Sequence, residues 1–223
     1  MNNLDKPEEL DELYRFSLVE NIGDLAEAHA LRLVRYEPRF PESDFWWLDK
    51  DRDVHGKVFT LHKGDRIGAS LRIVPVTACT TEIEELGLLP EDLKGDPSVW
   101  ELGRLVSVPS RGRDLPYSRL LFGWATQWAK VNLPIQKVVS YCRGGKVSGF
   151  EASGAKVVAG PYSVPERGDD YFTIVADLQD VVDRLSGYGF GTLLEAAAAG
   201  KTEFSTAEIL GSPRVPASSG TNK

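Results

Sequence analysis

Hydrophobic positions along this chain switch between a spacing of three to four residues and a spacing of two. The helical spacing comes first, over 24–36, and is carried by Leu25, Ala28, Leu31 and Val34. The strand spacing follows in two runs, 57–62 and 66–76, which the Lys63-Gly64-Asp65 turn separates. Two short β-prone runs on either side of a glycine turn predict an antiparallel hairpin.

A further strand is predicted over 99–108. A turn at 110–116 leads to a helix over 118–131, whose apolar face carries Leu121, Trp124, Ala125 and Trp128. Further on we expect a strand at 135–142, a short helix at 145–153, and a last strand pair at 156–158 and 171–176. This order is typical of an α+β fold with a strand, turn and helix at its middle.

The remaining segments show no sustained period. Residues 1–20 are charged, and their few apolar side chains fit a short helix or a mobile segment. An aromatic loop is expected at 40–47, and the charged run 49–53 follows it. The alanines at 196–199 lead to an end rich in Pro, Ser and Gly. We therefore expect one domain over 1–195 and a disordered tail over 196–223.

Composition narrows the class of protein. Hydrophobic residues make up 42% of the 223 positions, enough for a sizeable core, and the net charge of −7 makes nonspecific nucleic-acid binding a poor hypothesis. The two cysteines lack metal-ligand spacing, and their low number fits a reducing cytoplasm. No apolar stretch reaches the ~18 residues of a membrane span. The polar N-terminus is unlike a signal peptide, so we expect a cytoplasmic location.

Two charged residues interrupt the apolar strand over 99–108. Glu101 and Arg104 would face opposite sides of a regular strand, but a bulge near Gly103 would bring them to one side. A buried charge is costly unless it is paired or used. The two residues are therefore either a proton acceptor and a carboxylate or carbonyl partner, or a solvated ion pair at a sheet edge. Arg72 is a third charge in an apolar strand, and for it a structural salt bridge is the simpler interpretation.

The turn before the helix at 118–131 is basic. Arg111 and Arg113 precede the helix start, and Ser118 adds a hydroxyl. Backbone N–H groups at a helix start can hold phosphate oxygens, so this turn is a candidate site for the phosphopantetheine arm of an acyl donor. The alternative is a solvated loop in which the serine caps the helix.

These segments resemble the acyl-homoserine-lactone synthases, the autoinducer synthases with a GNAT-like acyltransferase fold. The strongest piece is Pro-Ser-Val-Trp-Glu-Leu-Gly-Arg at 97–104, which is similar to the family's Trp-Glu-x-x-Arg strand. Gly-Ala-Ser-Leu-Arg-Ile-Val-Pro at 68–75 resembles its Gly-x-x-Arg-Leu-x-Pro strand, and Leu31-Arg32 with Tyr36 resembles its Leu-Arg-x-x-x-Phe helix. The resemblance implies an α/β three-layer arrangement around a central mixed sheet, with a splayed, V-shaped strand pair.

Functional residues carry over position by position. The matches are Arg32, Asp53, Arg72, Glu101 and Arg104, with Tyr36 in place of the family's Phe and Trp46 or Trp47 in place of its invariant Trp. The first Asp of the family's spaced pair falls at Lys50, so Asp49 or Asp51 would have to substitute for it. On this basis Glu101 and Arg104 are catalytic candidates. Arg32, Tyr36, Trp47, Asp53 and Arg72 are candidates for binding S-adenosylmethionine.

The resemblance also implies a reaction. An acyl group passes from acyl carrier protein or coenzyme A to the amine of S-adenosylmethionine, which then closes to an acyl-homoserine lactone, a quorum-sensing signal, and releases methylthioadenosine. No metal and no permanently bound cofactor are expected. Candidates for the acyl pocket are Trp124, Trp128, Val138, Ser140, Cys142 and Phe150, although the aromatic residues also fit a plain core.

Two rival functions remain open at this stage. One is an N-acyltransferase that acylates another amine, such as an amino acid, without forming a lactone. The broken Asp pair leaves room for it. The other is a GNAT-like fold that serves as a binding or regulatory module, and the presence of both Glu101 and Arg104 argues against it.

Overall fold

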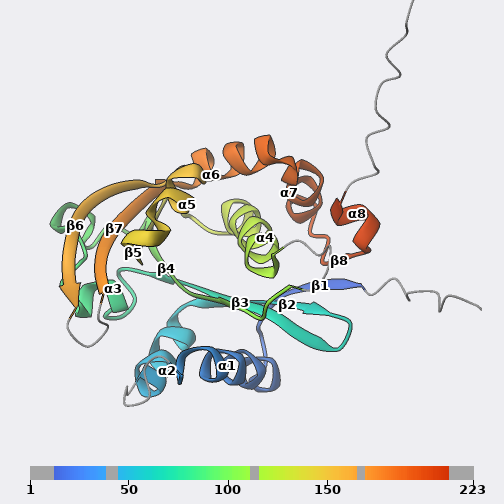
Figure 1. The fold of residues 1–223 in the computed structure, drawn as a ribbon, viewed down its shortest axis with the longest axis horizontal. Coiled ribbons are helices and arrows are strands. Elements are labelled where there is room, and N and C mark those ends of the chain that lie inside the picture. The colour runs from blue at the N-terminus through green and yellow to red at the C-terminus, as the bar shows by residue number, and fades with distance from the viewer. Residues whose placement is uncertain (1–12, 39–44, 111–115, 165–168, 211–223) are drawn as a thin grey trace, which may run out of the picture.

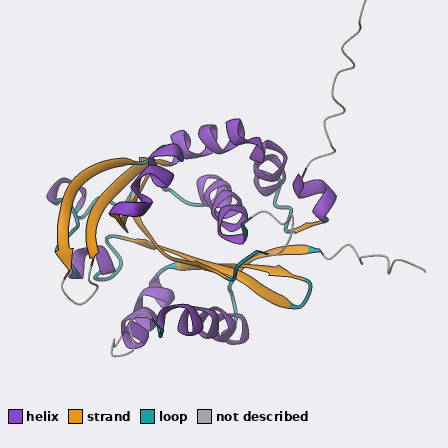
Figure 2. Ribbon diagram, viewed as in Figure 1, coloured by secondary structure: helices purple, strands orange, loops and turns teal. Residues whose placement is uncertain are grey.

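The computed structural model describes residues 13–38, 45–110, 116–164 and 169–210. Within these ranges the strands form one mixed sheet in the order β6-β7-β5-β4-β3-β2-β1-β8. Helices cover both of its faces, with α1 and α2 on one side and α4, α6 and α7 on the other (Figures 1 and 2). This is the layered α+β architecture that the sequence predicts.

The bounds of the elements are as follows. The strands are β1 Tyr14–Leu18, β2 Lys57–Lys63, β3 Arg66–Pro75, β4 Val99–Ser107, β5 Lys137–Arg143, β6 Lys156–Val164, β7 Asp169–Asp177 and β8 Glu203–Phe204. The α-helices are α1 Ile22–Tyr36, α2 Phe45–His55, α3 Glu82–Glu85, α4 Tyr117–Asn132, α5 Val147–Ala152, α6 Leu178–Leu185, α7 Gly191–Ala198 and α8 Thr206–Leu210. Short 3-10 turns lie at Glu91–Leu93 and Gly144–Lys146, and a π-helical turn at Ser186–Phe190 joins α6 to α7.

The parallel strands β4 and β5 separate after a short contact. They pair from Val99 opposite Lys137 to Glu101 opposite Val139. Beyond this point β4 stays with β3 as far as Ser107, whereas β5 stays with β7 as far as Arg143. The two strands therefore open into a V, which confirms the splayed pair implied by the resemblance.

A β-bulge interrupts β4 just past this opening. Ser70 of β3 lies opposite Val106, but Arg72 lies opposite Gly103, so β4 holds one extra residue between the two pairs. Arg104 occupies the left-handed region with φ of 53°. The extra residue reverses the alternation of side chains, so Glu101 and Arg104 lie on the same face, as the predicted bulge near Gly103 requires.

The main core lies between the sheet and α4. Trp124 of α4 is 1% exposed and stacks on Phe16 of β1, with ring centroids 5.5 Å apart. Its indole N–H donates to the carbonyl oxygen of Lys201 at 2.9 Å. Trp128 packs against Phe59 of β2, with centroids 5.4 Å apart. This core is an aromatic layer that joins α4 to the β1–β2 end of the sheet.

Three expectations about local structure are wrong. The segment predicted as a short helix or mobile stretch contains β1, in which Tyr14 and Phe16 are buried on either side of the exposed Arg15. Within the segment predicted as a loop and a charged run, residues 45–53 belong to α2, and 40–44 lie outside the described residues. The disordered tail predicted from residue 196 is wrong for 196–210, because α7 buries Ala197 and Phe204 of β8 is 2% exposed against Phe16. The rest of that tail, 211–223, lies outside the described residues.

Candidate active site

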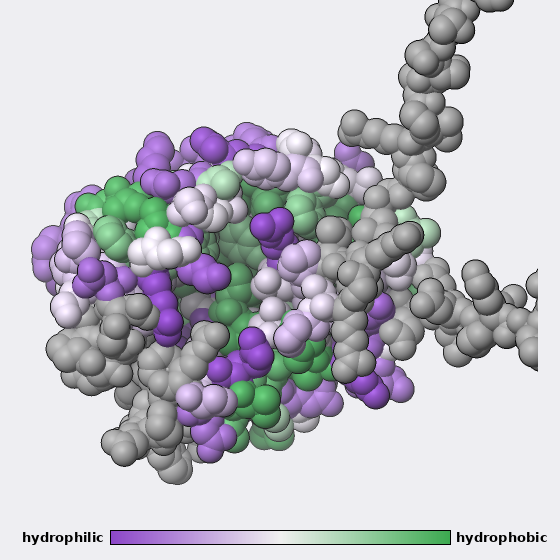
Figure 3. Space-filling model, viewed as in Figure 1, coloured by the Kyte–Doolittle hydropathy of each residue, from purple (hydrophilic) through white to green (hydrophobic). Residues whose placement is uncertain are grey.

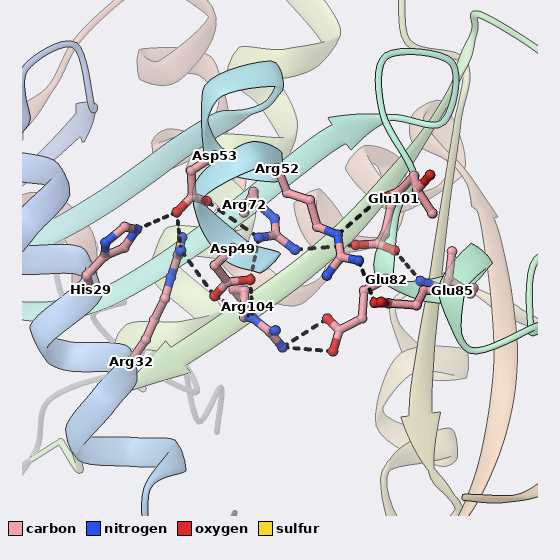
Figure 4. A network of polar contacts seen from close by, with 12 residues as sticks. His29, Arg32, Asp49, Arg52, Asp53, Arg72, Glu82, Glu85, Glu101 and Arg104 are labelled. Carbon is pink, nitrogen blue, oxygen red and sulfur yellow. Dashed lines mark hydrogen bonds and ion pairs between the residues drawn. The ribbon is translucent and has the colours of Figure 1, made fainter. Parts of the chain in front are cut away.

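Eight buried arginine, aspartate and glutamate side chains of the described chain lie between the sheet and helices α1–α3 (Figure 4). They are Arg32, Asp49, Arg52, Asp53, Arg72, Glu82, Glu101 and Arg104, and none is more than 8% exposed. Buried charges are costly unless they are paired. Arg32, Arg72 and Arg104 form ion pairs with all four carboxylates, whereas Arg52 pairs with Glu85, whose side chain is 44% exposed.

Asp49 of α2 lies at the centre of this network. Its Oδ1 accepts a hydrogen bond from Nη1 of Arg72 at 2.7 Å, and both its oxygens accept from Nε of Arg104 at 3.0 and 2.9 Å. Nη1 of Arg32 lies 3.7 Å from Oδ2. Burial alone would raise the pKa of Asp49, but Arg104, Arg72 and Arg32 together hold it below its ordinary value. One carboxylate thus joins arginines from a helix and two strands.

Asp53, one helical turn after Asp49, joins the network to the surface. Its Oδ2 accepts from Nη1 of Arg32 at 2.7 Å and lies 2.6 Å from Nε2 of His29. The side chain of His29 is 28% exposed. Burial opposes ionisation of Asp53, but His29, Arg32 and Arg72 lower its pKa. This carboxylate is therefore ionised at neutral pH.

Glu101 occupies the last position at which β4 and β5 still pair. Its Oε2 accepts the backbone N–H of Ile83 at 2.6 Å, while its Oε1 lies 3.6 Å from Nη2 of Arg72. Burial and the nearby Glu82 raise the pKa of Glu101, against the opposing effects of Arg72, the Ile83 N–H and Arg52. A carboxylate that binds a proton more tightly than usual is suited to accept one during a reaction.

Arg104 is held at both ends of its guanidinium group. Asp49 binds Nε, and Glu82 of α3 lies 3.1 and 2.9 Å from Nη1 through its two oxygens. The guanidinium carbon lies 5.4 Å from the ring centroid of Tyr36 at the end of α1. The bulge, both carboxylates and the aromatic ring together fix the position of this side chain.

The opposite face of the same strand is apolar. Leu102, the neighbour of Glu101, points into a cavity that also contacts Phe122, Val138, Ser140 and Phe150. The other residues that line it are Ser153, Ala155, Ile174, Val175, Ala176 and Val181. In the space-filling view hydrophobic residues gather in a hollow between α4 and α5 (Figure 3). Adjacent residues of β4 therefore face a charged region on one side and an apolar cavity on the other.

The expected acyl-pocket residues divide into two groups. Val138, Ser140 and Phe150 line the cavity. Trp124 and Trp128 do not, because they face the aromatic core at β1 and β2. Cys142 also lies outside the lining, and burial raises the pKa of its thiol to about 11. A thiol with such a pKa is protonated at neutral pH and is not an activated nucleophile.

Of the candidate phosphate-binding residues, Ser118 alone lies within the described residues. Ser118 lies in the first turn of α4, where Pro116 occupies the N-cap position and no side chain caps the helix. The serine cap considered from the sequence is therefore wrong. Arg111 and Arg113 lie outside the described residues, as does the side chain of Trp47 in α2.

The sequence interpretation missed several members of the network. Asp49 was only a possible substitute, Arg52 and Glu82 were not considered for the site, and His29 was expected to serve surface or core packing. Asp49, Arg52 and Asp53 have the spacing of one helical face, so the charged run itself held a signal. That signal was hidden because the buried face of α2 is charged, whereas periodicity is normally sought in apolar residues.

Among the described residues, no helix is both long and apolar enough to cross a lipid bilayer. No group of three or more His, Cys, Asp or Glu side chains among them is arranged to hold a metal ion.

Comparison with known proteins identifies the fold. No protein-family model and no curated protein sequence matches the chain. Among solved structures, FeeM, an N-acyl amino acid synthase from uncultured soil microbes, has a TM-score of 0.63 at 9% identity, over 77% of this chain and 94% of FeeM. The CoA-dependent acyl-homoserine lactone synthase BjaI, solved with S-adenosylmethionine and isopentyl-CoA, has a TM-score of 0.59 at 19% identity, over 78% of this chain and 89% of BjaI.

A third structure covers more of the chain. The acyl-homoserine lactone synthase LasI has a TM-score of 0.58 at 16% identity, over 86% of this chain and 97% of LasI. Identities this low establish a shared fold and leave the reaction open. This chain has the GNAT-like fold that acyl-homoserine lactone synthases share with other acyltransferases.

Proposed function

We propose that this chain is an N-acyltransferase that moves an acyl group from a thioester to the α-amine of S-adenosylmethionine. The observation that carries this proposal is the opening between β4 and β5. There Glu101 faces the charged network and Leu102 faces the apolar cavity. The apolar lining of the cavity suits an acyl chain, the charged side suits a polar amine, and the bond between them would form where the strands part.

The charged side suits a substrate that carries both signs of charge. Nε and Nη2 of Arg32 and of Arg72 are buried and make no hydrogen bond to any described residue. Buried donors of this kind suit a carboxylate, which can accept two N–H groups at once. Asp49 and Asp53 lie on the same face of α2, where they provide negative charge for a cation. S-adenosylmethionine carries a carboxylate, an ammonium group and a sulfonium group.

The proposed chemistry begins with a proton transfer. The ammonium group gives its proton to Glu101, directly or through a water, and the free amine attacks the thioester carbonyl. In this scheme, backbone N–H groups beyond the point where β4 and β5 separate stabilise the oxyanion. Collapse of this intermediate forms the amide, expels the thiolate, which becomes a thiol, and leaves one proton to be released. The substrate carboxylate then displaces methylthioadenosine from its own side chain and closes the lactone.

A second candidate acylates an amino acid and stops at the amide. The unpaired arginine donors support it equally well, because any α-amino acid has a carboxylate and an ammonium group. What favours S-adenosylmethionine is the second carboxylate on α2. Asp49 takes the place of the aspartate that the sequence match had put at Lys50, so two aspartates are present for an additional positive charge.

The experiment compares the two amine substrates directly. The purified full chain is incubated with acyl-CoA or acyl carrier protein thioesters of several lengths, and with either S-adenosylmethionine or a mixture of amino acids. Thiol release is followed with a thiol-reactive dye, and products are identified by mass spectrometry. We expect acyl-homoserine lactone and methylthioadenosine in equal amounts. An N-acyl amino acid would support the second candidate, and no thiol release with any pair would refute acyl transfer.

A further inference from the structure

Glu82 is a buried carboxylate that lies outside the set of residues matched by resemblance. It is the first residue of the short helix α3, which follows β3, and it is 2% exposed. Thr81 caps this helix by accepting the backbone N–H of Glu84 at 3.4 Å. The cap fixes the start of α3, so the Glu82 side chain is directed into the network and away from solvent (Figure 4).

The first role of Glu82 concerns Arg104. Its carboxylate lies 2.9 Å from Nη1 of Arg104, while Asp49 binds the Nε of the same guanidinium group. Helices α2 and α3 therefore hold the guanidinium group of Arg104 from its two ends. The backbone of Arg104 has φ of 53°, a conformation that residues with a Cβ rarely adopt. Such strain persists only where the surroundings over-determine it, and the two carboxylates do so here.

The second role concerns Glu101. The backbone N–H of Ile83, the next residue after Glu82, donates to the Glu101 carboxylate at 2.6 Å. The helix start that directs Glu82 therefore also anchors Glu101, and it keeps two like charges close together. The charged groups that act on Glu101 come from three elements, namely Arg72 of β3, Arg52 of α2 and Glu82 of α3. After burial, Glu82 is the strongest influence that raises the pKa of Glu101.

We propose that Glu82 is a positioning residue for the acyl-transfer site, which fixes the Arg104 guanidinium and sets the electrostatic field at the Glu101 carboxylate. The inference rests on the proposed function, because it assigns Glu101 the part of proton acceptor. Glu82 itself touches neither substrate in this scheme. It acts through the two charged residues of β4.

The test replaces Glu82 with Gln and uses Glu84→Gln on the same helix as the matched control. Titration of Glu101 is followed by carbon-13 NMR of the carboxylate carbons, with Glu101→Gln used to assign its signal. We expect the midpoint for Glu101 to fall in Glu82→Gln, because a neighbouring negative charge is lost, and to stay unchanged in Glu84→Gln. The acidic limb of the pH–rate profile should move to lower pH in the same variant.

A second variant separates the two roles. Glu82→Asp keeps the charge but shortens the side chain, so the Glu101 midpoint should stay close to that of the wild type. The kcat should still fall about 10- to 100-fold, because Arg104 is no longer held in place. A midpoint for Glu101 that is the same in wild type and Glu82→Gln would overturn the proposal. The NMR titration needs no turnover, so absence of acyl transfer would refute the proposed function and leave this result standing.

Discussion

Where β4 and β5 separate, the two faces of β4 carry different kinds of side chain. On the face toward α1 and α2, three arginines and four carboxylates are buried in one network of ion pairs. On the face toward α4, the neighbouring Leu102 contacts an apolar cavity. Buried ion pairs add little net stability, but they hold groups in one fixed geometry. An apolar cavity makes no directional contacts with its ligand, so it accepts any apolar chain of suitable volume.

This difference teaches how the two proposed substrates are recognised. The charged face would select its ligand strictly, because an absent partner leaves a buried charge unpaired. The apolar face would select by size, where one methylene group changes the preference only moderately. The following predictions test this division, beginning with the change that we expect to be largest.

Replacing the base should abolish most activity without unfolding the protein. In Glu101→Gln the amide keeps the shape of the side chain but does not accept the proton, so kcat should fall about 10²- to 10⁴-fold. Glu195→Gln, at an exposed position of α7, serves as the control and should behave as wild type. Normal turnover in a folded Glu101→Gln protein would exclude Glu101 from the mechanism.

Removing the central carboxylate should cost stability. Asp49→Ala takes one countercharge from Arg32, Arg72 and Arg104, all of them buried, so the free energy of unfolding should fall by about 3–5 kcal/mol. Asp51→Ala, at an exposed position of the same helix, should change it by less than about 0.5 kcal/mol. Urea denaturation gives both values. Equal losses in the two variants would mean that the network is not cooperative.

The aromatic core should contribute to stability and leave acyl selection unchanged. Trp124→Phe keeps a ring on Phe16 but loses the hydrogen bond to Lys201, which should lower the free energy of unfolding by about 1–3 kcal/mol. The preferred acyl length should stay the same, because Trp124 lies outside the cavity lining. A shift in the preferred length would place this residue in the acyl pocket after all.

The stability of the protein should depend on pH through the aspartates of the network. Asp49 and Asp53 have lowered pKa values in the folded chain, so they release protons more readily there than in the unfolded chain. Their contribution to stability is therefore present above the unfolded value of about 3.9 and is lost as the pH falls through the folded values. Asp53→Asn should flatten this dependence in thermal melts between pH 2 and 5 (roughly the window of carboxyl titration). An unchanged slope would show that Asp53 is not ionised in the folded protein.

Much of the fold follows from periodicity. The hairpin of β2 and β3 and the helices α1 and α4 match the predicted ranges closely. The apolar face of α4 packs in the main core, whereas Val34 of the predicted apolar face of α1 is 68% exposed. The bulge in β4 was also predictable, since a charged pair three residues apart next to a glycine is difficult to place in a regular strand. Where the buried side chains are apolar, their spacing in the sequence predicts the helix or strand directly.

Only part of the charged network could be predicted from the sequence, because its buried residues are charged and not apolar. Helix α2 buries Asp49, Arg52 and Asp53, so its inward face looks like a solvated surface in the sequence. Glu82 is a single acid in a four-residue helix, and only the fold brings it to Arg104, 22 residues away. Contacts between distant segments depend on strand order and register, which local patterns do not contain.

The most direct test of the division between the two faces fills the apolar cavity. Ser140→Leu adds volume at a position that lines the cavity and lies across the sheet from the charged network. The kcat/KM for the longest accepted acyl-CoA should fall about 10- to 200-fold relative to a short one. The KM for the amine substrate should stay within roughly twofold of wild type. A large change in the KM for the amine, together with an unchanged preference for acyl length, would contradict the assignment of the two substrates to opposite faces of β4.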